Sequence, residues 1–161
     1  MHKEQLFVKR IKEHEGILYK ITSVYADNKY DQQDLYQEIV FNLWKAFDSF
    51  RGDSKWSTWM YRIALNTSIT HKKKEKRNGF KVDLENVVLR ESDEYDTTFE
   101  EQLKELYLQI KQLNALDKGL ILLLLEGKKY DEIAVITGLS PSNVGTRISR
   151  IKQKLKQQVR H

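Results

Sequence analysis

The segment from Phe50 to Lys74 carries the side chains whose chemistry best suits a nucleic acid. Gly52, Asp53 and Ser54 form a turn cluster that can cap a helix, which we expect to begin near Lys55. Spacings of three and four residues place a set of polar and aromatic side chains along one edge of that helix: Trp59, Arg62, Asn66, Thr70 and Lys73. An indole can stack on an unpaired base, an amide can bind a base edge, and cations can neutralise phosphates. This edge therefore predicts contact with a nucleic acid.

Apolar positions of the same helix fall on two roughly opposite faces. At about 100° per residue, one face comprises Trp56, Met60, Ile63 and Thr67, and the other comprises Tyr61, Leu65 and Ile69. We therefore expect the helix to be packed from both sides. A purely structural interpretation of the polar edge stays open, in which Trp59 is a core residue and Arg62 is the solvated partner of a carboxylate.

The segment from Tyr130 to Lys156 has the pattern of a helix-turn-helix. Ala134 is small enough for a close helix crossing, Gly138 permits the positive φ of the turn, and Pro141 suits the first position of the second helix. That helix would bury Val144, Ile148, Ile151 and Leu155 and expose Ser142, Asn143, Thr146, Arg147, Arg150, Gln153 and Lys154. The exposed set predicts a recognition helix for duplex DNA. The alternative is a helical hairpin with a basic, solvated surface.

A third functional surface is predicted on the helix from Asp31 to Phe47, with Asp31 as its N-cap. Its broad apolar face comprises Leu35, Tyr36, Ile39, Val40, Leu43, Trp44 and Phe47. The opposite side carries Asp34, Gln37, Glu38 and Lys45, with Phe41 among them. A large aromatic ring on a polar face favours a protein partner, because such rings are enriched at interfaces. The alternative is a solvated acidic face with one incidental exposed ring.

Composition excludes several classes of protein. The 161 residues include no cysteine, so a disulfide framework, a thiolate metal site and a cysteine nucleophile are absent. The net charge of +5 favours a polyanionic partner, although an anionic membrane surface has the same attraction. We expect a soluble, cytoplasmic protein, because the N-terminus lacks an apolar signal region and the longest apolar run, 120–125, is too short to span a bilayer.

The order of the segments predicts an all-α protein of two small domains. With one proline, seven glycines and no period-two alternation, the chain favours helices throughout. We expect two helical pieces over 6–26 that break near Gly16, and two helices over 99–113 and 117–126 before a C-cap at Gly127. A basic run over 71–81 precedes an acidic stretch over 83–101 without helical periodicity. We therefore predict domains at 1–80 and 99–161, joined by a flexible acidic linker at 81–98.

The segment FRGDSKWSTWMYRIALN resembles the region 2 signature of the extracytoplasmic-function group of sigma factors, F-R-G-D-S-x-[FW]-x-T-W-[LM]-x-R-I-A-x-N. The resemblance implies that this part of the chain recognises and melts the minus-10 promoter element. The residues it implicates are Phe50, Arg51, Asp53, Ser54, Trp59, Arg62, Asn66, Thr70 and Lys73.

Two other segments resemble further parts of the same family. Asp34, Gln37 and Glu38 match the part of region 2 that docks on the clamp helices of the polymerase beta-prime subunit, whereas the usual aromatic after the Gln-Glu pair is replaced by Val40, followed by Phe41. The helix-turn-helix resembles region 4, which implies minus-35 contacts by Ser142, Asn143, Thr146, Arg147, Arg150 and Lys154. Gly145 stands where the family often has a basic residue, so a contact is lost there and the helix is weakened.

Together these features predict a transcription initiation factor that binds core RNA polymerase, through the beta-prime clamp helices and the beta flap, and directs it to promoter DNA. The resemblance also implies an anti-sigma partner, no catalytic activity, and no cofactor or metal. One alternative is a helix-turn-helix regulator that acts without polymerase and uses its N-terminal half to dimerise. A metal-dependent nuclease built from Asp31, Asp34, Glu38 and His71 is disfavoured, because these carboxylates lie on one open helix face with no ligand-spaced histidine nearby.

Overall fold

The computed structural model describes residues 2–52, 55–77 and 97–159, and within these ranges the side chains of 72–77, 97–98 and 158–159 are not described. The described residues form α-helices and one 3-10 turn, without a strand, which confirms the all-α prediction. The chain divides into two compact units, Met1–Asn86 and Val87–His161. The division falls inside the segment predicted as a linker, most of which lies outside the described residues, so the boundaries at 80 and 99 stay predictions.

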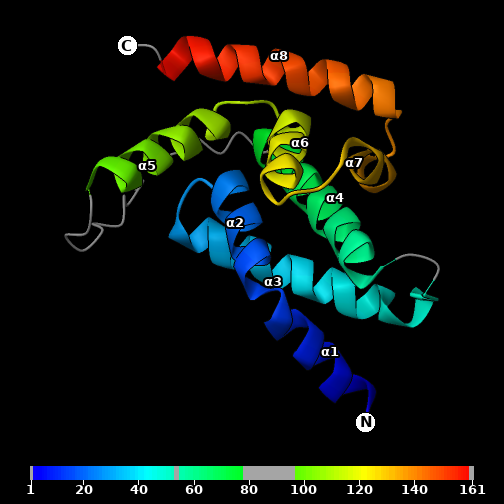
Figure 1. The fold of residues 1–161 in the computed structure, drawn as a ribbon. Coiled ribbons are helices and arrows are strands. Elements are labelled where there is room, and N and C mark those ends of the chain that lie inside the picture. Colours follow the sequence, from blue (N-terminus) through cyan, green and yellow to red (C-terminus); the bar gives the residue numbers. More distant parts are fainter. Residues whose placement is uncertain (1, 53–54, 78–96, 160–161) are drawn as a thin grey trace. The chain divides into compact units, whose positions relative to one another are not determined.

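The first unit is built on three mutually packed helices. Its elements are α1 (Lys3–Glu13), α2 (Glu15–Tyr25), α3 (Lys29–Ala46), the 3-10 turn η1 (Phe47–Ser49) and α4 (Trp56–Arg77). Helix α4 packs against α3, and α2 packs against both of them (Figure 1). Their shared core consists of Leu18, Ile21, Leu35, Ile39, Leu43, Met60 and Ala64. Because α4 meets α2 and α3 together, the prediction that it is packed from two sides is confirmed.

Two local details of the first unit differ from the sequence expectations. The break between α1 and α2 falls at His14, slightly before the predicted position at Gly16. The N-cap of α3 is Asn28, so the prediction that Asp31 caps this helix is wrong. The Asn28 side chain accepts a hydrogen bond from the Asp31 backbone N–H at 2.8 Å. It therefore satisfies one of the N–H groups in the first turn that have no partner within the helix, as an N-cap does. The Asp31 carboxylate instead accepts a hydrogen bond from the Asp27 backbone N–H at 3.1 Å.

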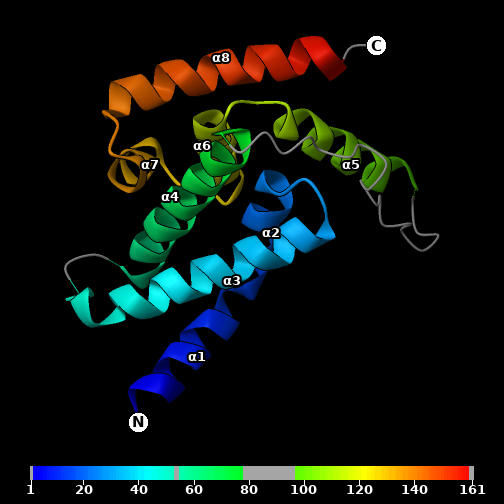
Figure 2. The same cartoon turned by 180° about the vertical axis from the view of Figure 1, so that it is seen from behind.

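The second unit is a bundle organised around its last helix. Its elements are α5 (Thr97–Lys111), α6 (Ala115–Leu125), α7 (Tyr130–Thr137) and α8 (Pro141–Val159). Helix α8 packs against α5, α6 and α7, and Figure 2 shows it from behind. All the predicted core positions of α8 are buried: Val144, Ile148, Ile151 and Leu155. The helix-turn-helix of α7 and α8 is therefore confirmed.

Glycines end two helices of the second unit in the way the sequence predicts. Gly127 has φ of 83° after α6, and Gly138 has φ of 79° between α7 and α8. Both values lie in the left-handed region, which is accessible to glycine at little cost. Among the described residues, no helix is both long enough and apolar enough to cross a membrane.

Candidate functional site

The polar edge of α4 is formed as predicted. Arg62, Asn66 and Thr70 are exposed and follow one another by about one helical turn, while the core side of the helix is held by Met60 and Ala64. The side chain of Lys73, predicted to extend this edge, lies outside the described part of the chain. The described portion of the edge offers a guanidinium, an amide and a hydroxyl in a row, which suits phosphates and base edges.

Trp59 is half-buried at one end of an aromatic cluster. Its ring centroid lies 4.8 Å from that of Trp56 and 5.3 Å from that of Phe50. The cluster continues through Phe47, Phe7 and Trp44, with neighbouring centroids 5.1–5.6 Å apart. Such tilted and edge-to-face pairs are favourable beyond the area that they bury. Trp59 is therefore neither a fully buried core residue nor an isolated surface ring.

Helix α1 holds this cluster in place, a contribution that the sequence did not reveal. Phe7 supplies a ring, and the guanidinium of Arg10 lies 4.9 Å from the Trp56 ring centroid and 5.8 Å from that of Phe50. A cation over an aromatic face is attracted by the ring quadrupole. Phe50 is half-buried and Arg51 is exposed, whereas Asp53 and Ser54 lie outside the described residues. The start of the predicted minus-10 segment is thus anchored through aromatic packing.

The polar side of α3 exposes most of the predicted partner surface. Asp34 and Gln37 are exposed, and Phe41 has 57% of its surface accessible. The ammonium of Lys45 lies 4.7 Å from the Phe41 ring centroid, which orients the ring without covering it. On the apolar side of α3, burial raises the pKa of the Tyr36 phenol, and the carboxylate of Glu15 raises it further.

Glu38 faces α4, where His71 binds it together with Asp31. The Nε2 atom of His71 lies 2.7 Å from Oδ1 of Asp31, and its Nδ1 atom lies 3.1 Å from Oε2 of Glu38. The expectation that these carboxylates lie on an open helix face is therefore wrong for Asp31 and Glu38, because His71 of α4 lies against both. A sequence separation of 33 or 40 residues leaves no local pattern that could have revealed the contact.

The arrangement of these side chains does not form a metal centre. The two ring nitrogens of an imidazole point in different directions, so Asp31 and Glu38 bind opposite edges of His71 and do not share one point. No group of three or more His, Cys, Asp or Glu side chains in the described part of the chain could hold a metal ion. The cluster is a bridge between two helices.

Helix α8 exposes most of its predicted DNA-contacting residues. Exposed side chains on it include Ser142, Asn143, Thr146, Arg150 and Lys154. Arg147 is half-buried, and its guanidinium lies 3.5 Å from Oδ1 of Asp117 at the start of α6. This ion pair competes with any phosphate for Arg147. Arg150 is therefore the stronger candidate for a direct DNA contact.

Comparison with known proteins identifies both units. The family model of Sigma-70 region 2 matches residues 10–78, and that of Sigma-70 region 4 matches residues 103–155. The RNA polymerase sigma factor SigV of Bacillus subtilis is 30% identical over 148 residues, which cover 90% of this chain and 86% of that protein. The chain belongs to the sigma-70 family of sigma factors.

Further similarity places this sigma factor in the extracytoplasmic-function group. The ECF RNA polymerase sigma-E factor of Escherichia coli K12 is 29% identical over 141 residues, which cover 80% of this chain and 74% of that protein. The sigma factor RpoE of Bartonella quintana, solved in complex with the anti-sigma factor NepR, shares the fold. Its TM-score is 0.77 at 20% identity, over 96% of this chain and 98% of that one.

Gly145 of this sigma factor faces the ring of Tyr130. A Cβ atom at this position would lie 3.5 Å from the ring of Tyr130, which packs against α8 at the start of α7. That distance is an ordinary van der Waals contact, so a methyl group would fit. A longer side chain at this position would share this space with the Tyr130 ring.

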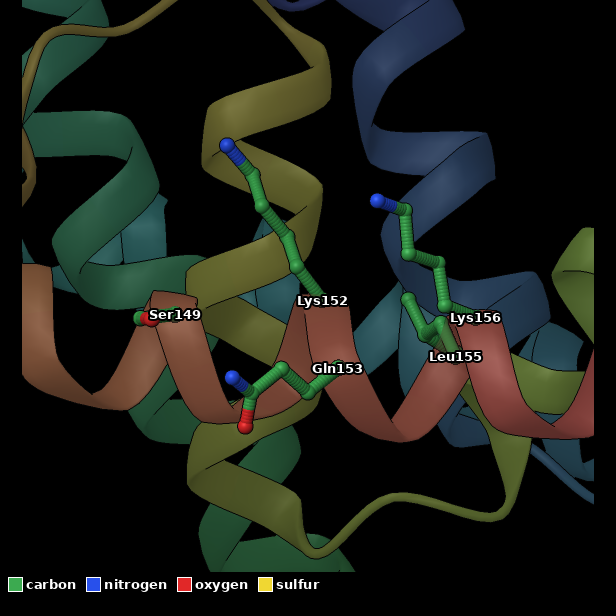
Figure 3. Close-up of a pocket in the computed structure, with 5 residues that line it drawn as sticks. All are labelled: Ser149, Lys152, Gln153, Leu155 and Lys156. Atoms are coloured by element: carbon green, nitrogen blue, oxygen red, sulfur yellow. The ribbon is translucent and has the colours of Figure 1, made fainter.

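The other flank of α8 is hollowed and basic. The hollow is lined by Ser149, Lys152, Gln153, Leu155 and Lys156, and Figure 3 shows the side chains of Lys152 and Lys156 extending to the same side of the helix. At about 100° per residue, Lys152 lies nearly opposite Arg150 on α8. The hollow nevertheless shares Gln153 with the exposed face that is predicted to read DNA.

Proposed function

We propose that this sigma factor binds core RNA polymerase through α3, melts the minus-10 element with α4, and reads the minus-35 element with α8. The single observation that carries the proposal is the match to regions 2 and 4 in one chain, and in each unit several of the implicated side chains are exposed. A duplex-binding regulator would require the α8 surface alone. Exposed polar surfaces on both α3 and α4 favour an initiation factor.

Docking on polymerase is assigned to Asp34, Gln37, Glu38 and Phe41. Asp34 and Gln37 present charge and hydrogen-bonding groups to solvent, and the exposed ring of Phe41 lies on the same helix. Exposed aromatics that are bordered by charge are typical of protein interfaces. We assign the contact to the beta-prime clamp helices, and we expect the second unit to reach the beta flap.

Strand opening is assigned to the edge of α4 and the aromatic residues next to it. Asn66 can bind a base edge, Arg62 can bind a phosphate, and the accessible part of Trp59 can stack on an unpaired base. A surface that binds only the unpaired strand shifts the melting equilibrium by its differential affinity. Capture of extruded bases would thus drive promoter opening.

Several wider assignments follow from this function. A solved relative by fold is bound to an anti-sigma factor, and we propose that an anti-sigma factor also regulates this chain. We place its action in the cytoplasm, where bacterial polymerase works, and assign it no catalytic activity, cofactor or metal. The domain limits that we propose are 1–80 for region 2, 81–98 for the linker and 99–161 for region 4.

A charge reversal on α3 tests the proposal. Asp34→Lys should weaken binding to purified core polymerase at least about tenfold. The substitution places a positive charge against the polymerase surface that binds the Asp34 carboxylate in the wild type. Asp34 is exposed, so the circular dichroism spectrum and the melting temperature should stay unchanged. Affinity is measured by fluorescence anisotropy of the labelled full-length protein.

Glu13→Lys is the matched control, since it makes the same charge change at an exposed site on α1. It should bind polymerase as the wild type does. Equal affinity of Asp34→Lys and wild type would contradict the docking assignment. A wild-type protein that binds duplex promoter DNA but not polymerase would instead support the helix-turn-helix regulator.

A further inference from the structure

His71 joins the helix that carries the proposed minus-10 contacts to the helix that carries the proposed polymerase contacts. It follows Thr70 directly on α4, and its ring lies between Asp31 and Glu38 of α3 at 2.7 and 3.1 Å. The side chains of His71 and Asp31 are only 15% and 12% exposed, whereas that of Glu38 is 34% exposed. The bridge is thus largely shielded on the Asp31 side and open to solvent on the Glu38 side.

The two hydrogen bonds need a proton that a neutral imidazole does not have. A carboxylate only accepts hydrogen bonds, and a neutral imidazole has one N–H donor and one acceptor nitrogen. Only the imidazolium donates from both ring nitrogens. In the neutral form, one ring nitrogen would direct its lone pair at a carboxylate oxygen. The doubly bound geometry therefore corresponds to a protonated His71 between two ionised carboxylates.

The carboxylates of α3 favour that protonated form. On α3, the exposed Asp34 lies one turn before Glu38. Between α2 and α3, the backbone N–H of Asp27 donates to Oδ2 of Asp31 at 3.1 Å, which orients this carboxylate. The titratable residue at the end of α2 is the buried Tyr25. On α4, residues 72–77 follow His71 in the sequence. Five of them are Lys or Arg, whose charge acts against an imidazolium, and one is Glu; their side chains lie outside the described part of the chain.

We propose that protonated His71 is a positioning residue for polymerase binding, an inference that rests on the function proposed above. The imidazolium holds the Glu38 carboxylate beside Asp34 and fixes α4 against α3. When His71 loses its proton, one of its two hydrogen bonds is lost and Glu38 is released. Affinity for core polymerase therefore falls as the pH rises through the titration of His71. The device connects polymerase docking to the pH around the protein.

The protonation state is tested directly on the free full-length protein. Nitrogen NMR of the His71 ring should show protons on both ring nitrogens at low pH and loss of one proton at a titration midpoint that the same spectra define. A ring that is singly protonated throughout the range in which the protein stays folded would overturn the proposal.

The functional consequence is tested with variants at pH values on either side of that midpoint. His71→Gln stays uncharged and can donate to only one carboxylate well, so the wild type should bind core polymerase about tenfold more tightly below the midpoint. Above the midpoint the two affinities should converge. His71→Lys, which stays charged, should restore tight binding below the midpoint and keep it above. A constant ratio of wild-type to His71→Gln affinity across the midpoint would overturn the proposal.

His14→Gln is the matched control, because His14 lies at the break between α1 and α2 and contacts the Arg10 carbonyl oxygen. The ratio of the affinity of His14→Gln for core polymerase to that of the wild type should not change with pH. Asp34→Lys in the same assay separates the two proposals. If Asp34→Lys binds normally, the docking surface is wrong, whatever His71 does. If Asp34→Lys loses binding while the ratio of wild-type to His71→Gln affinity stays constant across the midpoint, only the role of His71 is wrong.

Discussion

Asn66 and Asn42 place the same side chain in two different environments. Asn66 is exposed on the edge of α4. The amide of Asn42 on α3 donates to the Thr67 hydroxyl at 3.0 Å and ties α3 to α4. Trp59 is less suitable for testing strand opening, because it packs on Trp56 and its removal would change stability and surface together. The two asparagines separate these effects.

We predict that Asn66→Ala impairs promoter opening without lowering stability. Loss of a base contact should lower the stability of the open complex relative to the closed complex by roughly 1–3 kcal/mol. A template with a melted minus-10 bubble should recover much of the transcription. Asn42→Ala should instead lower the free energy of unfolding by about 1 kcal/mol and open promoters normally once folded. Permanganate footprinting and thermal melting of both variants provide the measurements. Normal opening by Asn66→Ala would remove this residue from the minus-10 surface.

At the scale of the element, one glycine inside α8 and one glycine just before it have opposite effects on the stability of the second unit. Gly145 lies inside the helix, where glycine costs backbone entropy and a Cβ atom would meet Tyr130 at 3.5 Å. Gly138 lies in the turn before the helix with φ of 79°, a conformation that an L-residue adopts only with strain. The same substitution should therefore have opposite signs at the two positions.

We predict that Gly145→Ala raises the free energy of unfolding of the second unit by about 0.5–1 kcal/mol, because alanine is the better helix former. Gly138→Ala should lower it by about 1–3 kcal/mol. Hydrogen exchange of the α8 amides in the full-length protein measures both. A loss of protection in Gly145→Ala would mean that the Tyr130 ring cannot accommodate even a methyl group.

At the scale of the whole molecule, each unit has its own hydrophobic core. Leu35 is fully buried in the first unit, and Leu123 is almost fully buried in the second. The helix pairs with the most extensive packing all lie within one unit or the other. Two separate cores predict two separate unfolding transitions.

Leu35→Ala should lower the stability of the first unit by about 2–5 kcal/mol, from lost transfer energy and the cavity left behind. Hydrogen exchange of α6 and α8 should remain as in the wild type. Leu123→Ala is the reciprocal variant and should destabilise α5 to α8 alone. Equal loss of protection throughout the chain in either variant would show that the two units unfold as one.

Much of the fold and of the surfaces could be predicted because those signals are local. The amphipathic stripes of α3, α4 and α8 follow from a period of about 3.6 residues, and burial of Leu35, Met60 and Ile148 agrees with them. The turn at Gly138 depends on the backbone freedom of one residue. The sequence prediction placed the N-cap of α3 at Asp31, whereas the structure has it at Asn28. Both residue types can cap a helix, and only the path of the backbone decides which of them does.

By itself, the sequence determined the helical elements, their apolar faces and the side chains exposed on α3, α4 and α8. Only the tertiary structure decided which of those side chains meet. It paired His71 with Asp31 and Glu38, Arg147 with Asp117, and Trp56 with Arg10. Periodicity records which side of a helix faces the core, whereas a contact between residues far apart in the chain depends on how the helices cross. That crossing is set by the packing of all the core side chains at once.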